Sequence, residues 1–156
     1  MFSLRSVTKD VTAPYSAVEA FAYDHFLGDP AAAAMAVSFD SFVGDARDVL
    51  DVGAGGGQGV VFVADRHADA RVTALDLSPV LVDRAQKRLA KFGPRARAVV
   101  GSAMALPFAD ASFDAVWSMA SLKHWPDKLQ GLREIVRVLK PGGRLCVVEV
   151  DRGCHV

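Results

Sequence analysis

The chain has 156 residues, a formal net charge of zero, 51% hydrophobic residues and 23% charged residues. This composition is typical of one globular domain, which at this length buries roughly 70% of its unfolded surface. The balanced charge disfavours nucleic acid and anionic membrane surfaces as partners, because a neutral protein does not attract them. There are two cysteines, no run of 18 apolar residues and no cationic leader, so we expect reduced thiols in a cytoplasmic protein without a membrane segment.

The first 45 residues differ in character from the remainder. Apolar residues at helical spacing predict a helix over 14–27, and an alanine-rich stretch predicts a second helix over 30–42. We expect one compact domain in which residues 1–45 form a helical segment capping a ligand site and residues 46–156 form the core. Three side chains on the first helix are candidate ligand contacts, although packing explains them better: Tyr15, Tyr23 and His25.

From residue 48 onward, strand-like and helix-like segments alternate, which favours an α/β fold with a parallel sheet. Right-handed crossovers would wind these segments into a Rossmann-like, doubly wound and mostly parallel sheet, with the carboxyl ends of its strands at one edge. The predicted strands are rich in Val and Leu, as expected where helices cover both faces, and span 48–52, 71–76, 96–101, 113–118 and 144–150.

Two helices between these strands have recognisable ends. After the second strand, Ser78 can cap a helix, Pro79 suits its first turn and Gly93-Pro94 stops it. The helix before the last strand is predicted to end at 140–143, where the sequence is Lys-Pro-Gly-Gly. Its predicted apolar face consists of Leu129, Leu132, Val136 and Leu139.

Two carboxylates come near the ends of predicted buried strands. Asp51 leads into a glycine-rich turn, and Asp76 ends the next strand. Glycines let a ligand approach the backbone because no Cβ stands in the way. A carboxylate on the second strand can accept both hydroxyls of a ribose. These features together predict a pocket for a nucleoside-like ligand.

The glycine spacing separates two classes of ligand. A pyrophosphate-binding turn needs Gly-x-Gly-x-x-Gly, and the third glycine is missing in every frame, where Gln58, Val60 or Phe62 stands instead. This argues against a dehydrogenase that binds a nicotinamide cofactor. The spacing that fits is Asp-x-Gly-x-Gly-x-Gly, starting at Asp51.

That spacing resembles motif I of the class I S-adenosylmethionine-dependent methyltransferases. Residues 101–108, 113–118, 122–125 and 134–145 resemble, in order and spacing, the corresponding segments of methyltransferases with the type 11 domain. The resemblance runs from about 48 to 150. It implies the class I methyltransferase fold and transfer of a methyl group from S-adenosylmethionine to a small-molecule acceptor by in-line displacement. S-adenosylhomocysteine would be the product.

The resemblance also implies cofactor-binding roles. Asp51 would face the ligand's amino group, while Gly53, Ala54 and Gly55 would let the methionine part lie against the backbone. Asp76 would accept the ribose hydroxyls. The adenine would be bordered by Leu77, Ser102, Ala103 and Met104, and the methionine end by Ser118 and Met119.

The chain departs from the family pattern in two places. Where Ser102 stands, the family usually has an acidic residue that binds the adenine amino group, and losing such a charged hydrogen bond costs about tenfold to a hundredfold in affinity. Family members also continue past the fifth strand with a helix and an antiparallel hairpin, which we expect this chain to lack. Either the chain is truncated, or a second copy covers the exposed edge as a homodimer.

His124 is the candidate general base, which is needed only if the acceptor must lose a proton. The pair His124-Trp125 before a proline is nevertheless more typical of packing at a helix entry. No residues have metal-ligand spacing, so we expect no metal site. The alternative function is a protein of the same fold that binds S-adenosylmethionine or another adenosyl ligand without methyl transfer, which Ser102 and the short C-terminus favour. The sequence leaves the acceptor and its acceptor atom open.

Overall fold

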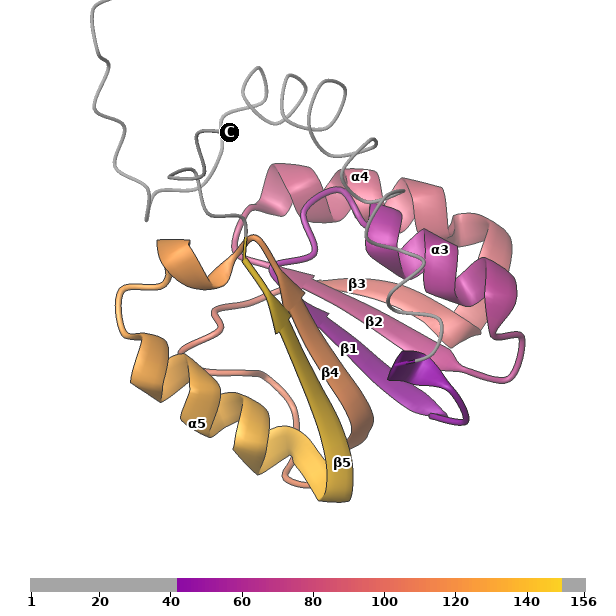
Figure 1. Cartoon of the computed structure of the whole chain (residues 1–156). Helices are drawn as coiled ribbons and strands as arrows, with labels where there is room; N and C mark the ends of the chain where they lie inside the picture. The colour runs from indigo at the N-terminus through magenta and orange to yellow at the C-terminus, as the bar shows by residue number, and fades with distance from the viewer. Residues whose placement is uncertain (1–41, 150–156) are drawn as a thin grey trace, which may run out of the picture.

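The computed structural model describes residues 42–149. They contain a five-stranded sheet in the order β3-β2-β1-β4-β5, and every neighbouring pair is parallel (Figure 1). The strands are β1 (Asp48–Val52), β2 (Arg71–Asp76), β3 (Ala96–Val100), β4 (Phe113–Met119) and β5 (Leu139–Val148). The strand order reverses beside β1, and this switch point is where ligands of such sheets bind. The predicted helix over 14–27, the predicted helix over 30–42 except for its last residue, and the side chains of Tyr15, Tyr23 and His25 lie outside the described residues.

Helices cover both faces of this sheet, which confirms the doubly wound fold. The α-helices are α3 (Gln58–Arg66), α4 (Pro79–Leu89) and α5 (Lys128–Val138), and two 3-10 helices are η2 (Ala90–Arg95) and η3 (Leu122–His124). Figure 1 shows α3 and α4 on one side of the sheet and α5 on the other. Within residues 42–149, no helix is both long and apolar enough to cross a membrane.

Each face has its own apolar core. On the α3 side, Val63 packs among Val49, Val72 and neighbouring side chains, and none of the three is more than 1% exposed. On the α5 side, Ile135 packs in the same cluster as Leu50. This two-sided burial explains why the strands are rich in Val and Leu rather than alternating with polar residues.

The helix after β2 begins as predicted. Ser78 caps α4 by accepting a hydrogen bond from the Leu81 N–H at 3.5 Å, and Pro79 is the first helical residue. The chain then passes through η2, where Gly93 adopts a φ of 62°. Leu81, Ala85 and Leu89 form the buried face, one turn apart on the helix.

The predicted face of α5 was wrong. Leu129 and Val136 are each 66% exposed, whereas the buried residues are Gly131, Ile135 and Val138. Both sets follow helical spacing, so periodicity alone could not separate them. The decisive contact is at Gly131, where a Cβ would lie 2.5 Å from the Trp125 indole, and the glycine therefore marks the packed face.

The last strand starts five residues earlier than the predicted 144, at Leu139. Leu139 pairs with Phe113 and Arg144 pairs with Ala115, so residues 140–143 form an irregularity inside β5. The strand is an edge of the sheet that residues 42–149 form.

Candidate functional site

The glycine-rich turn after β1 is tied to the end of β2 by backbone hydrogen bonds. The N–H groups of Gly53 and Ala54 both donate to Leu75 O, at 2.8 and 3.0 Å. The next N–H, of Gly55, donates to Asp76 Oδ2 at 2.9 Å. The two predicted carboxylates, Asp51 and Asp76, therefore lie at one edge of the sheet, close enough for Asp76 to affect the pKa of Asp51.

Asp76 is held in a fixed orientation. Its Oδ1 accepts from the Ser78 N–H at 2.9 Å, while Oδ2 is held by Gly55. A carboxylate has about four acceptor positions, so Asp76 can accept further donors beside these backbone N–H groups. Burial raises the pKa of Asp76, and the backbone N–H groups of Ser78, Gly55 and Leu77 offset part of that rise. The side chain is thus a positioned acceptor for two neighbouring hydroxyls.

Asp51 is buried more deeply, at 3% exposed. It lies opposite Trp117 of β4 in the sheet register. A Cβ built on Gly59, in the first turn of α3, would lie 3.3 Å from Asp51 Oδ2 and 3.8 Å from Trp117 Nε1. Burial raises the pKa of Asp51 to about 8; the Trp117 N–H lowers it in part, and the charge of Asp76 raises it further.

Two buried polar atoms at this edge, Asp51 Oδ1 and Ser118 Oγ, have no hydrogen-bond partner among residues 42–149. Native structures satisfy nearly all such atoms, and the exceptions are typical of functional sites. Ser118 is fully buried near the end of β4, and Met119, the last residue of that strand, is half-buried. The ends of β1 and β4 therefore offer polar groups to a bound molecule.

The loop after β3 borders the other side of the site and is held by α5. Ser102 Oγ accepts from the Met104 N–H at 3.1 Å, and Met104 O accepts from Gln130 Nε2 at 3.3 Å. Glu134 of α5 accepts from the Leu106 N–H at 2.8 Å. Ala103 is buried between these anchors. The predicted adenine-side residues therefore lie on a loop whose backbone is fixed at several points.

Two exposed aliphatic side chains lie at the ends of β2 and β3. Leu77 is 48% exposed and Val100, at the end of β3, is 49% exposed. Large exposed aliphatic side chains beside a polar site are suited to the face of a planar base. Sequence analysis included Leu77 but not Val100, because Val100 reads as part of an ordinary buried strand.

A separate groove of about 490 Å³ lies at the opposite edge, where the strands begin. Arg71, Arg97 and Phe108 are among its lining residues. None of the predicted site residues lines it, so the groove does not belong to the candidate site.

Comparison with known proteins identifies the family. Residues 50–147 match the family model described as a methyltransferase domain, which is more than half of the chain. The chain belongs to the methyltransferase domain family.

Three similar proteins illustrate the relationship. The 27-O-demethylrifamycin SV methyltransferase of Amycolatopsis mediterranei (strain S699) is 42% identical over 101 residues, which are 64% of this chain and 37% of that protein. The structure of the cyclase SpnF has a TM-score of 0.67 and 36% identity over 77% of this chain and 44% of its own. Phosphoethanolamine N-methyltransferase 2 of Haemonchus contortus, solved with S-adenosylmethionine, has a TM-score of 0.74 and 27% identity, over 85% of this chain and 33% of its own. This methyltransferase-family chain thus spans less than half of each.

Ser121 lies beside the candidate site of this methyltransferase domain, and sequence analysis did not single it out. A Cβ on Gly53 would coincide with Cβ and Oγ of Ser121, so the space beside Gly53 is filled by this side chain. The contact of Gly53 with the methionine part of the ligand stays a prediction. The glycine at 53 therefore accommodates a serine from the turn after β4, a contact that no local sequence pattern could reveal.

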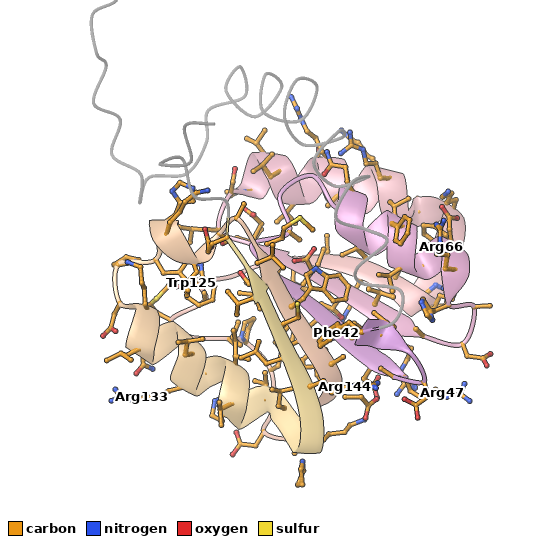
Figure 2. All side chains as sticks on the ribbon, in the orientation of Figure 1. Phe42, Arg47, Arg66, Trp125, Arg133 and Arg144 are labelled. Carbon is orange, nitrogen blue, oxygen red and sulfur yellow. The ribbon has the colours of Figure 1, made fainter. Side chains whose placement is uncertain are left out.

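His124 and Trp125, which are adjacent in the sequence, differ in their burial. Figure 2 shows Trp125 between η3 and α5, where it is 6% exposed and packs on Gly131, which confirms the packing interpretation for the tryptophan. His124 ends η3, is half-buried and donates its backbone N–H to Ser121 O at 2.9 Å. Its role as a base stays a prediction.

Proposed function

We propose that this methyltransferase domain binds S-adenosylmethionine at the carboxyl ends of β1, β2 and β4 and transfers its methyl group to a small-molecule acceptor. One observation carries the proposal. The buried Asp51 and the half-buried Asp76 flank the glycine turn, and no cationic side chain of residues 42–149 contributes to the pKa of either. Such a group stays protonated unless a cationic ligand stabilises its charge, because an unpaired buried charge is costly.

The charges favour this ligand over a dinucleotide. S-adenosylmethionine has an ammonium and a sulfonium, both positive, which would favour the ionised forms of Asp51 and Asp76, whereas a negative pyrophosphate would be repelled by those forms. Asp51 would meet the ammonium with Oδ1, the oxygen that has no partner among residues 42–149. Asp76 would use its remaining acceptor positions for the ribose hydroxyls.

The remaining predicted residues would surround the rest of the ligand. Leu77 and Val100 would contact the faces of the adenine, and Ser102, Ala103 and Met104 would offer polar and backbone groups to its edge. The methionine end would meet Gly53, Ala54 and Gly55 on one side and the end of β4 on the other, through Ser118 and Met119.

S-adenosylmethionine supplies a methyl group on a sulfonium, which is a built-in leaving group. The protein's contribution would be to hold the methyl in line with the acceptor atom and to exclude water. His124 would take a proton if the acceptor is a hydroxyl or an amine that must lose one. The names of two relatives favour an oxygen atom of a small molecule as the acceptor: the 27-O-demethylrifamycin SV methyltransferase and the tocopherol O-methyltransferase of Arabidopsis thaliana.

We also propose roles for the segments around the site. Residues 1–45 would cap the ligand, and residues 46–156 would form the binding core. A second copy would cover the edge at β5, where Leu145 is 38% exposed. Analytical ultracentrifugation checks the homodimer.

The test is an assay with S-adenosylmethionine labelled in its methyl group and a panel of phenols, hydroquinones and amines. We expect S-adenosylhomocysteine and a labelled product with at least one acceptor, and no product from Asp76→Ala. Asp114→Ala, at the opposite edge, is the matched control and should retain activity. If the unmodified protein does not bind S-adenosylmethionine, the proposal is contradicted.

The second candidate is an adenosyl-binding protein of the same fold without methyl transfer. The similarity to SpnF, named as a cyclase, favours it, because that protein shares this fold. Binding of S-adenosylmethionine without any S-adenosylhomocysteine formed across the acceptor panel would support this second function.

A further inference from the structure

The turn after β4 brings Ser121 to the glycine turn after β1. Ala120 has a φ of 52°, in the left-handed region that non-glycine residues rarely adopt. Its N–H donates to Val148 O at 2.7 Å, which ties the turn to β5. The result is that Ser121 lies directly against Gly53, two residues beyond Asp51. Backbone strain of this kind is typical of functional sites, where it positions a side chain.

The Ser121 hydroxyl has a defined hydrogen-bond direction. Trp125 Nε1 donates to Ser121 Oγ at 3.0 Å. An indole N–H can only donate, so the serine oxygen is the acceptor in this bond. The hydroxyl hydrogen of Ser121 is therefore left for another acceptor, and none is found for it among residues 42–149.

The donor in that bond is itself fixed. Trp125 is 6% exposed and packs on Gly131 of α5, where a Cβ would lie 2.5 Å from its ring. The indole cannot move away without disturbing the α5 core. Because it holds one lone pair of Ser121 Oγ, the remaining hydroxyl hydrogen is restricted to directions away from Trp125.

The ligand proposed above supplies the missing acceptor. Its methionine end has an ammonium and a carboxylate, and Asp51 would bind the ammonium. The carboxylate then needs a donor on the same side of the glycine turn. The nearest lysine in sequence, Lys123, forms an ion pair with Glu149 at 3.8 Å, so its charge already has a partner.

We propose that Ser121 donates its hydroxyl hydrogen to the carboxylate at the methionine end of the ligand, with Trp125 as the positioning residue behind it. This inference rests on the proposed function. Asp51 and Ser121 would then form a matched pair, an acceptor for the ammonium and a donor for the carboxylate, on either side of Gly53. The pair distinguishes complete S-adenosyl amino acids from nucleosides that lack the amino-acid end.

The test compares two probes by calorimetry: S-adenosylhomocysteine, and 5′-methylthioadenosine, which lacks both the carboxylate and the ammonium. For Ser121→Ala we expect affinity for S-adenosylhomocysteine to fall about tenfold, as for loss of one hydrogen bond to a charged group. Affinity for 5′-methylthioadenosine should stay within about twofold, since the rest of the site is intact.

Two further variants sharpen the test. Trp125→Phe keeps a ring against Gly131 but removes the N–H, and we expect about a threefold loss for S-adenosylhomocysteine alone. Ser112→Ala, which removes a hydroxyl that donates to Ala109 O at 2.7 Å, is the matched control and should bind both probes as the unmodified protein does.

The outcomes separate this inference from the proposed function. Equal losses for the two probes in Ser121→Ala would show a purely structural serine and overturn the inference, as would unchanged binding of both. Absence of S-adenosylhomocysteine binding by the unmodified protein would overturn the proposed function, and the inference with it.

Discussion

Aspartates at the two edges of the sheet have opposite electrostatic surroundings. Where the strands begin, Asp48 pairs with Arg71 at 2.7 Å and with Lys140 at 2.9 Å, and Asp114 pairs with Lys140 at 2.8 Å. Partial burial raises the pKa of Asp114, but the hydrogen bonds from Lys140 and from backbone N–H groups outweigh it, and the net pKa is lowered. Where the strands end, burial raises the pKa of Asp51, and no cationic side chain of the described residues opposes that rise.

The difference teaches which carboxylates hold the fold together and which are available to a ligand. At the amino-terminal edge each charge is neutralised within the protein, and the groups are partly solvated. At the carboxyl-terminal edge the buried Asp51 and the half-buried Asp76 have no cationic partner within residues 42–149, so ionising them lowers stability. Strongly perturbed groups of this kind cluster at functional sites. The following variants test this contrast.

The largest effect is expected for Gly53→Ala. Gly53 has a φ of 82°, and its Cβ would coincide with Ser121, so both backbone strain and overpacking oppose the change. We expect a loss of about 3 kcal/mol in the free energy of unfolding, measured with urea. Gly142→Ala is the matched control at the other edge: φ is 78° with no atom within 4 Å, and the loss should be about 1 kcal/mol. Equal losses would contradict the contact with Ser121.

The next effect is the pH dependence of stability through Asp51. Its folded pKa, about 8, exceeds its unfolded value of 3.8, so the unfolded chain releases the proton first. Stability should therefore fall as pH rises from about 4 to about 8 and level off above, with a slope of up to about 1.4 kcal/mol per pH unit. Asp51→Asn should remove nearly all of that fall, about 3 kcal/mol between pH 5 and 7. An unchanged pH profile in the variant would show that Asp51 is ionised at neutral pH.

A smaller effect is expected for Ser102→Asp. One aspartate oxygen could cap the Met104 N–H, as Ser102 Oγ does now at 3.1 Å, and the other could accept from the adenine amino group. We expect about tenfold tighter binding of S-adenosylhomocysteine by calorimetry. Ser102→Ala is the control, and tighter binding by that variant would rule out the hydrogen bond as the cause.

The smallest effect is expected at the amino-terminal edge. Asp114→Asn weakens one ion pair with Lys140 but keeps an acceptor for the N–H groups of Arg47 and Asp48. Because the group is partly exposed, the loss of stability should be about 1 kcal/mol or less. Ligand affinity should not change, and a clear loss of affinity would undermine the contrast between the two edges.

The sequence predicted those parts that depend on local pattern. Strands β1 and β2 have their predicted bounds, and the cap at Ser78 is confirmed, because buried runs and capping residues act within a few positions. The face of α5 and the start of β5 were wrong, since each depends on contacts across the sheet, at Gly131 and at Phe113.

The site divides in the same way. Asp51 and Asp76 come together because parallel strands end at one edge, a rule that follows from topology. Ser121 and Trp117 could not be found this way. Ser121 contacts Gly53 and Trp117 pairs with Asp51, so each contact joins segments more than sixty residues apart. In the sequence alone, Ser121 is typical of a turn and Trp117 of a buried strand.

The most direct test of the central claim is a calorimetric titration with S-adenosylmethionine and S-adenosylhomocysteine of three proteins: the unmodified chain, Asp76→Ala and Asp114→Ala. Saturable binding that Asp76→Ala loses and Asp114→Ala retains is the predicted result. It would show that the carboxylates without a cation serve the ligand. Equal binding by all three proteins, or no binding by the unmodified chain, would contradict the account.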